Sequence, residues 1–237
     1  DGERVVIKFL NREYPEPREL SRFRLEYRLT AHLQGLAGVI AAHELIEVRN
    51  SLALILEDIG GESLAQNLAE LLISDRLRYA IQIADVLARV HENEIIHRDL
   101  KPSNIILNPE TGVLKLTDFG TASLLPSEHA GLTGSGRIIG TLAYMSPEQT
   151  GRMNRVVDSR SDLYSLGVIL YELFTGAPPF QDDDALALIH SHIARVPPAP
   201  HAVDPAVPKP LSDIVMKLLA KVPEHRYQSA GGVRHDL

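Results

Sequence analysis

The sequence contains no cysteine among its 237 residues. Disulfide bonds, thiolate catalysis and cysteine-ligated metal sites are therefore excluded, and we expect a reducing compartment, the cytoplasm. No apolar run reaches the roughly 18 residues that a membrane-spanning helix needs, so no span is expected. The net charge of −7 lacks the basic excess that non-specific nucleic-acid binding leaves on a protein, so no nucleic-acid partner is expected.

An initiating methionine and a signal peptide are also missing, because the chain opens on the charged run Asp1-Gly2-Glu3-Arg4. It ends on Asp236-Leu237 without a stop signal for a helix, so we expect a fragment. A hydrophobic content of 44% is ample for a core. This length and composition allow either one large domain or two small lobes that share a cleft.

The most informative stretch present is Ile96-His97-Arg98-Asp99-Leu100-Lys101-Pro102-Ser103-Asn104, followed by Asp118-Phe119-Gly120. Two apolar runs, 105–107 and 113–116, separate these polar groups, with a turn at 108–112. The pattern predicts a hairpin that brings both loops to one end. Phosphoryl transfer from a nucleotide needs such a set: a carboxylate for a hydroxyl proton, an amide and a carboxylate for magnesium, and a lysine for phosphate charge.

This stretch resembles the catalytic loop and the magnesium-binding loop of the protein kinase family. The resemblance implies that Asp99 orients and deprotonates the substrate hydroxyl and that Lys101 neutralises the γ-phosphate of ATP during transfer. It implies that Asn104 and Asp118 bind Mg²⁺. Ile106, on the strand after the catalytic loop, is expected to form the floor under adenine.

The same resemblance covers nearly the whole chain and implies an α+β, two-lobed protein-kinase fold. A small antiparallel β lobe is expected over residues 1–57, and the hinge with a large, mainly helical lobe over 58–237. Small-lobe strands are predicted at Val5–Leu10, Leu45–Arg49 and Leu52–Leu56. The family's first two strands and their glycine-rich phosphate loop would come earlier. We therefore expect a truncated small lobe, an unpaired edge on the first strand and weakened ATP binding.

Two further residues are assigned to the nucleotide by resemblance. Lys8, in the first strand, would hold the α- and β-phosphates. Glu26, in a helical pattern between Tyr14 and Leu36, would form an ion pair with Lys8. The alternatives are an ordinary exposed strand lysine and a solvated glutamate beside Arg22 and Arg24.

The run Leu56-Glu57-Asp58-Ile59-Gly60-Gly61-Glu62 resembles the hinge between kinase lobes. By resemblance, the Glu57 carbonyl and the Ile59 amide would read the edge of adenine, so their side chains are weakly constrained. Glu62 would accept ribose hydroxyls. The alternative for Glu62 is an acid at a helix N-terminus, before Ser63, where the helix dipole favours negative charge. Both interpretations stay open.

Residues 118–148 resemble the kinase activation segment. Thr133 and Ser135 are candidate phosphorylation sites, and Arg98 would pair with the phosphate. The alternative is that both are ordinary loop hydroxyls. Thr141, with Lys101, resembles the serine/threonine-specific pattern.

Other residues are expected to be structural. By resemblance His97 is a buried scaffold residue, Asp162 holds the backbone of the catalytic loop, and Glu148 pairs with Arg226.

Helices are predicted over 161–174, with Gly176 as the cap, over 185–194, and over Leu211–Lys221, the last one expected. The acidic run Asp182–Asp184 is interpreted as a helix cap, in preference to a metal cluster. The proline-rich stretch Pro197–Pro210 is predicted to be a loop.

These observations predict a serine/threonine protein kinase that transfers the γ-phosphate of ATP, with Mg²⁺, to Ser/Thr hydroxyls of a protein substrate. The alternative is a catalytically weak scaffold or docking module with a kinase fold. A module that only binds has no chemical need for the whole predicted set Lys8, Glu26, Asp99, Asn104 and Asp118.

Residues 144–155 also resemble a segment of large bacterial signalling proteins, which place such a kinase before an ATPase module and a sensor histidine kinase. Further domains in the same polypeptide are therefore expected.

Overall fold

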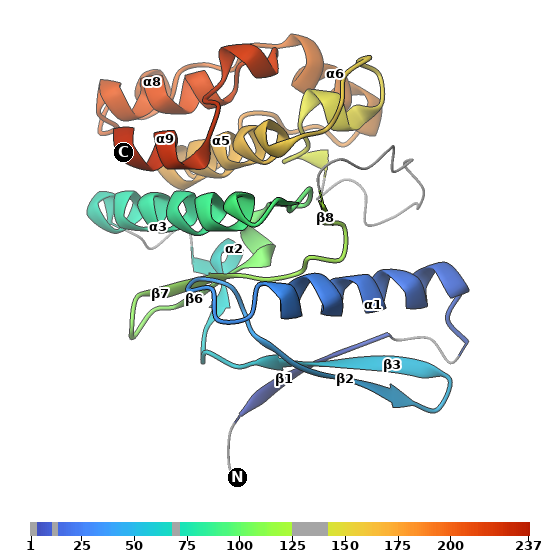
Figure 1. Ribbon diagram of the computed structural model, residues 1–237. Helices are drawn as coiled ribbons and strands as arrows, with labels where there is room; N and C mark the ends of the chain where they lie inside the picture. Colours follow the sequence, from blue (N-terminus) through green and yellow to red (C-terminus); the bar gives the residue numbers. More distant parts are fainter. Residues whose placement is uncertain (1–3, 11–13, 68–71, 125–141) are drawn as a thin grey trace.

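The computed structural model describes residues 4–10, 14–67, 72–124 and 142–237. It has a small lobe, built from an antiparallel sheet and one long helix, and a larger, mainly helical lobe (Figure 1). The long helix α1 (Pro17–His32) lies between the small-lobe sheet and the large lobe (Figure 1). The expected α+β, two-lobed protein-kinase fold is therefore confirmed.

The small-lobe sheet has the order β1-β3-β2, with strands β1 (Val5–Phe9), β2 (Ala42–Val48) and β3 (Ser51–Glu57). All three predicted strands are present, but β2 begins three residues earlier than expected. Within the described part of the chain, β1 pairs only with β3 and forms an edge of the sheet, as predicted. The pairing places Lys8 opposite Leu54.

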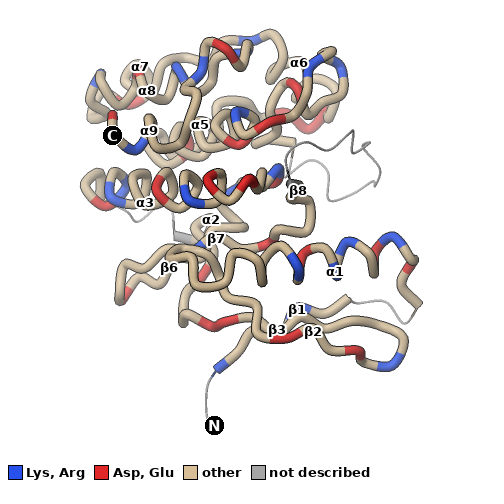
Figure 2. Tube along the Cα trace, in the orientation of Figure 1, with Lys and Arg blue, Asp and Glu red and all other residues tan. Residues whose placement is uncertain are grey.

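Helix α1 packs on this sheet through a separate small core. Phe23 belongs to one cluster of buried side chains with Leu52, Leu54 and Leu56 of β3. The buried positions of α1 recur at intervals of three or four residues and form one face of the helix. Phe23 on this face belongs to the small-lobe core, whereas Leu29 belongs to the core of the large lobe. Four of the exposed positions of α1 are arginines (Arg18, Arg22, Arg24 and Arg28), and Figure 2 marks Lys and Arg in blue along the helix.

The large lobe is organised around α5 (Ser159–Thr175), in which every residue from Ser161 to Tyr171 is buried. Helix α5 ends at Gly176, whose φ of 85° is the left-handed conformation predicted for its cap. A Cβ at Gly167 would lie 2.7 Å from Leu218 Cβ, so glycine permits the close approach of α5 to α8. The other helices are α2 (Leu64–Asn67), α3 (Ile73–Glu92), α6 (Ala185–Ala194), α7 (Pro200–Val203), α8 (Lys209–Leu218) and α9 (Ala230–Asp236).

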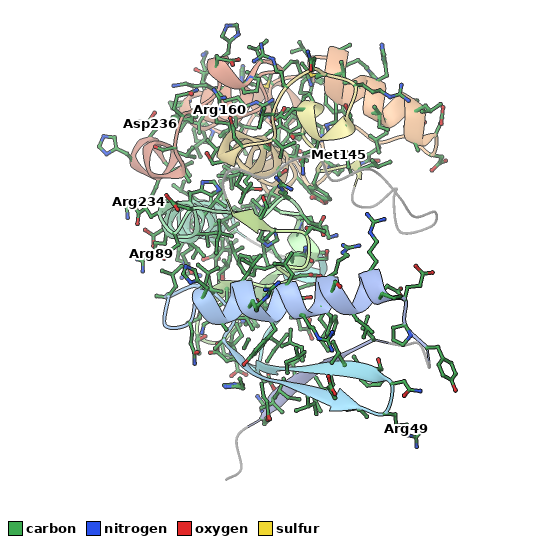
Figure 3. All side chains as sticks on the ribbon, turned by 45° about the vertical axis from the view of Figure 1, so that its right-hand side comes forward. Arg49, Arg89, Met145, Arg160, Arg234 and Asp236 are labelled. Atoms are coloured by element: carbon green, nitrogen blue, oxygen red, sulfur yellow. The ribbon has the colours of Figure 1, made fainter. Side chains whose placement is uncertain are left out.

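Two helix predictions need correction. The helix predicted over Leu211–Lys221 is α8, which ends at Leu218, and it is not the last, because α9 follows. The pair Gly231-Gly232 hides α9 in the sequence, but tertiary contact with α3 supports it: Asp85 of α3 pairs with Arg89 at 2.8 Å and with Arg234 of α9 at 2.6 Å (Figure 3).

The stretch Pro197–Pro210, predicted as a loop, contains the short helix α7, which begins at Pro200 where a proline is tolerated. The prediction for Asp182–Asp184 is confirmed at Asp184, which caps α6 by accepting the backbone N–H of Leu186 at 3.0 Å. None of the helices in the described ranges is long and apolar enough to cross a membrane.

The predicted hairpin is present as β6 (Ile105–Asn108) and β7 (Val113–Leu116), and β4 (Glu62–Ser63) pairs with β6 on its other side. The backbone N–H of Thr117 donates to the Asn104 carbonyl at 3.0 Å and closes the open end of the hairpin. The loop that ends at Asn104 and the loop that begins at Thr117 are therefore joined at the open end of the hairpin. Smaller elements are β5 (Ile95–Ile96), β8 (Ser123–Leu124), η2 (Pro102–Asn104), η3 (Pro147–Thr150) and η4 (Pro223–His225).

Candidate active site

The catalytic-loop residues predicted from sequence form one hydrogen-bonded cluster. Lys101 Nζ lies 2.7 Å from Asp99 Oδ2. Asn104 Nδ2 donates to the Asp99 backbone carbonyl at 2.8 Å and to Asp99 Oδ2 at 3.2 Å. The turn of η2 holds Asn104 in this position, since the Asn104 N–H donates to the Lys101 carbonyl at 2.9 Å. A carboxylate, an amide and an ammonium group therefore meet at one point.

A second cluster joins β1, α1 and the loop after β7. Lys8 Nζ lies 2.7 Å from Glu26 Oε1 and 3.0 Å from Asp118 Oδ1. The expected Lys8–Glu26 ion pair is therefore present. Asp118 has φ of 65°, and a Cβ at Gly120 would lie 3.2 Å from Asp118 Oδ1 and 3.1 Å from Glu26 Oε2. Glycine at 120 lets the loop approach both carboxylates.

Burial and charge act against each other within this cluster. Burial lowers the pKa of Lys8, but the carboxylates of Asp118 and Glu26 outweigh it, so the net pKa is raised. Burial raises the pKa of Glu26 more than Lys8 lowers it. The pKa of Asp118 is lowered, because Lys8 more than offsets its burial. Lys8 is thus held charged and Asp118 is held ionised, the states that phosphate and metal binding need.

Asp162 of α5 holds the backbone of the catalytic loop by hydrogen bonds, as predicted. Its carboxylate accepts the backbone N–H groups of His97 and Arg98, each at 2.8 Å, and it is fully buried. His91 Nε2, in the last turn of α3, lies 2.9 Å from the same carboxylate. Burial alone would raise the pKa of Asp162, but the hydrogen bond from His91 and the neighbouring charges lower it. Sequence reasoning missed His91, although its place at a helix C-terminus, just before the catalytic loop, was a signal.

His97 is buried, as expected of a scaffold residue. Its Nε2 lies 3.1 Å from the Thr117 carbonyl, and its ring packs on Phe119 with centroids 4.8 Å apart. Phe119 has no exposed surface. These contacts fix the loop that carries Asp118 against the loop that carries Asp99.

The hinge residues lie where the small-lobe sheet meets β4. The Glu57 side chain binds Lys115 Nζ at 2.6 and 2.8 Å and accepts the Ala41 N–H at 3.0 Å. Asn108 Nδ2 donates to the Ile59 carbonyl at 2.7 Å. Side chains of the β6–β7 hairpin therefore hold the hinge through the Glu57 side chain and the Ile59 backbone carbonyl. Lys115 was not singled out in the sequence, where a lysine inside an apolar strand was its only signal.

Glu62 is exposed and pairs with Leu107 across β4 and β6. Ile106 is half-buried and lies opposite Ser63. Adenine and ribose contacts through Glu57, Ile59, Glu62 and Ile106 stay predictions.

The end of the activation segment is anchored in the large lobe. Arg226 Nη1 and Nη2 bind the two Glu148 oxygens at 2.7 and 2.9 Å, which confirms the predicted pair. Ser161 Oγ donates to Glu148 Oε1 at 2.7 Å. The candidate phosphorylation sites Thr133 and Ser135, and Thr141, lie outside the described residues.

Comparison with known proteins agrees with this site and fold. The family model described as the protein kinase domain matches residues 1–237. The serine/threonine-protein kinase Pkn1 of Myxococcus xanthus is 37% identical over 100% of this chain and 34% of its own length. PrkC of Bacillus subtilis, also named a serine/threonine-protein kinase, is 32% identical over 98% of this chain and 36% of its own. PknB of Mycobacterium tuberculosis is 43% identical over 62% of this chain and 23% of its own.

Fold and site together define the two-lobed architecture of a protein kinase domain, with a lysine–carboxylate cluster shared between the lobes and a catalytic loop in the large one. The chain belongs to the protein kinase domain family. It spans about a third of the length of the relatives that it matches from end to end.

Proposed function

We propose that this chain is the catalytic domain of a serine/threonine protein kinase, which transfers the γ-phosphoryl group of ATP to a Ser or Thr hydroxyl of a protein substrate. One observation carries the proposal: the hairpin β6–β7 brings the Asp99 cluster and the Lys8 cluster together through adjoining loops. Relatives that match the whole chain are named serine/threonine kinases, which supports the choice of acceptor.

In the proposed reaction, the substrate oxygen forms a bond to the γ-phosphorus while the bond from that phosphorus to the bridging oxygen of ADP breaks. Asp99 orients the hydroxyl and takes its proton. Lys101, 2.7 Å from Asp99, is placed to neutralise charge on the phosphoryl group as it passes. Lys8 holds the α- and β-phosphates, and Glu26 keeps the Lys8 ammonium group directed at those phosphates.

The donor set fits Mg²⁺, which prefers oxygen ligands and commonly uses one or two carboxylates together with substrate phosphates. Asn104 donates through Nδ2 to Asp99, so its oxygen Oδ1 is the ligand atom. The lowered pKa of Asp118 keeps that carboxylate ionised. Among the described residues no group of three or more His, Cys, Asp or Glu side chains could hold a metal by itself, in keeping with a site that phosphates complete. When bound, Mg²⁺ would neutralise the charge that develops on the phosphates.

Adenine would lie against the backbone of Glu57 and Ile59, with Ile106 below it and Glu62 near the ribose. The small lobe of this unit would comprise residues 1–57, and the hinge and large lobe 58–237. We place the domain in the cytoplasm, where ATP is available, and within a longer polypeptide, as in its longer relatives.

Replacing Asp99 tests this function. Asp99→Asn keeps the shape of the side chain but removes the base, and we expect the rate of transfer to a Ser/Thr peptide to fall about 10²–10⁴-fold. Asp183→Asn, which neutralises an exposed carboxylate far along the chain, is the matched control and should retain the wild-type rate. A wild-type protein that binds ATP but transfers no phosphate would support the scaffold alternative. Wild-type turnover in Asp99→Asn would refute the role of Asp99.

A further inference from the structure

Arg98, the residue before the proposed base, is held by both of its backbone groups. Its φ of 65° is a conformation that residues other than glycine adopt rarely. Its N–H donates to Asp162 Oδ1 at 2.8 Å. Its carbonyl accepts a hydrogen bond from Gln149 Nε2 at 2.7 Å. Side chains from two separate elements, α5 and η3, therefore fix one strained residue.

The orientation of the Gln149 amide is determined by its partners. Its Oε1 accepts the Ser146 backbone N–H at 3.0 Å and the Ser146 hydroxyl at 2.9 Å. A backbone N–H can only donate and the Arg98 carbonyl can only accept, so Nε2 must face Arg98. One side chain thus spans from the first turn of η3 to the catalytic loop.

We propose that Gln149 is a positioning residue that couples residues 142–150 to the proposed base. The Arg98 carbonyl belongs to the same planar peptide as the Asp99 N–H, so holding that oxygen sets the direction in which the Asp99 side chain leaves the backbone. Residues 142–148 are the described end of the activation segment, and residues 147–150 form η3. The end of that segment is thereby linked mechanically to Asp99. This inference rests on the proposed kinase function.

The linkage predicts a specific kinetic signature. Gln149 contacts the catalytic loop and not the Lys8 cluster, which the structure builds from β1, α1 and the Asp118 loop. Losing the Arg98 bond should therefore misplace the base without weakening nucleotide binding. The turnover number kcat should fall while the KM for ATP stays the same.

The choice of substitution matters, because a cavity of about 10 Å³ lined by Gln149, Arg98 and Tyr144 adjoins this bond. It has room for about one water, which could take over the role of a truncated side chain in Gln149→Ala. Gln149→Glu is sharper. Its carboxylate still accepts both hydrogen bonds from Ser146, but it loses the donor to Arg98 and sets a negative charge against the Arg98 carbonyl. Gln149→Met, of similar volume and without charge, serves as the second variant should the glutamate prevent folding.

The control is Ser146→Ala, which removes the hydroxyl contacts with the Gln149 side chain and backbone N–H but leaves the Ser146 N–H and the Arg98 bond in place. We expect kcat to fall about 10–100-fold in Gln149→Glu and Gln149→Met. The KM for ATP and the melting temperature should stay near wild type, and Ser146→Ala should retain its kcat. A folded Gln149→Glu or Gln149→Met with wild-type kcat would overturn the inference, as would an equal loss in Ser146→Ala.

Measuring wild type and Asp99→Asn in the same assay tests the positioning role of Gln149 separately from the proposed kinase function. If wild type transfers phosphate, Asp99→Asn does not, and a folded Gln149 variant keeps full kcat, only the positioning role fails. If wild type and Asp99→Asn behave alike, the proposed function itself fails.

Discussion

Two of the ion pairs among the described residues have the same length but different character. Lys8 and Glu26 meet at 2.7 Å, and the Lys8 side chain is 33% exposed. Arg226 and Glu148 also meet at 2.7 Å, but their side chains are 0% and 1% exposed. Lys8 offers one ammonium group to two carboxylates, Glu26 and Asp118, whereas Arg226 binds both oxygens of a single carboxylate.

The two cations differ in how many hydrogen bonds hold them and in how exposed they are to solvent, and this difference separates a structural role from a ligand-binding one. The Arg226 guanidinium also donates to the carbonyls of Ala220, Arg160 and Lys221, so its hydrogen bonds hold it in one geometry. The Lys8 ammonium is a point charge at the edge of solvent, shared between the lobes. In the proposed function this ammonium group contacts the phosphates of ATP. The first pair therefore stabilises the large lobe, and the second is suited to bind a ligand.

Breaking the buried pair should give the largest effect. Arg226→Met leaves the Glu148 carboxylate buried with Ser161 as its remaining side-chain partner, and we expect the free energy of unfolding to fall by about 3–5 kcal/mol. Urea unfolding followed by circular dichroism measures this. Glu148→Met combined with Arg226→Met should lose less than the sum of the two single changes. A single variant within about 1 kcal/mol of wild type would contradict the contrast.

A buried histidine beside this region gives a pH-dependent test. Burial, with the nearby charge of Lys221, lowers the pKa of His192 to about 4, from 6.5 in the unfolded chain. Between these values the unfolded state binds more protons, so stability falls as pH falls from 6.5 to 4. One such proton contributes up to about 1.4 kcal/mol per pH unit. His192→Gln should show a shallower loss in urea titrations across this window, and an unchanged slope would refute the assignment.

Breaking the Lys8–Glu26 pair, in which Lys8 is 33% exposed and Glu26 only 4%, should affect activity far more than stability. Lys8→Met removes the proposed phosphate contact and should abolish transfer, but the free energy of unfolding should fall by only roughly 1–2 kcal/mol. The cost is limited because Glu26, whose pKa is already raised by burial, can take up a proton. The double change with Glu26→Gln should recover stability and not activity. A loss of stability as large as that of Arg226→Met would show that the Lys8–Glu26 pair is as important for stability as the Arg226–Glu148 pair, contrary to this prediction.

A third ion pair, more exposed than the other two, should have the smallest effect on stability. Lys209 and Asp213 meet at 2.6 Å one turn apart on α8, with side chains 69% and 58% exposed. Lys209→Ala should change the free energy of unfolding by no more than about 0.5 kcal/mol, because water and salt screen such pairs. The same urea assay checks it, and a loss above about 1 kcal/mol would show that distance alone, without burial, sets the strength of these pairs.

The sequence by itself determined the features that depend on near neighbours along the chain. The catalytic loop, the hairpin after it and the helix cap at Asp184 all lie within a few residues of the signals that predict them. The long apolar run of α5 was equally clear, since every face of that helix is buried. Local spacing and turn chemistry suffice in such cases. The Lys8–Glu26 and Glu148–Arg226 pairs, although distant in sequence, were reached through family resemblance.

Only the tertiary structure decided which distant groups share a hydrogen bond. His91 meets Asp162 across 71 residues, Lys115 meets Glu57 across 58, and Gln149 meets Arg98 across 51. No local pattern encodes these contacts, because each requires two elements to be packed before the side chains come within reach. The same reason explains why α9 was missed: its glycines disfavour a helix locally, and packing against α3 supplies the stability that local propensity lacks.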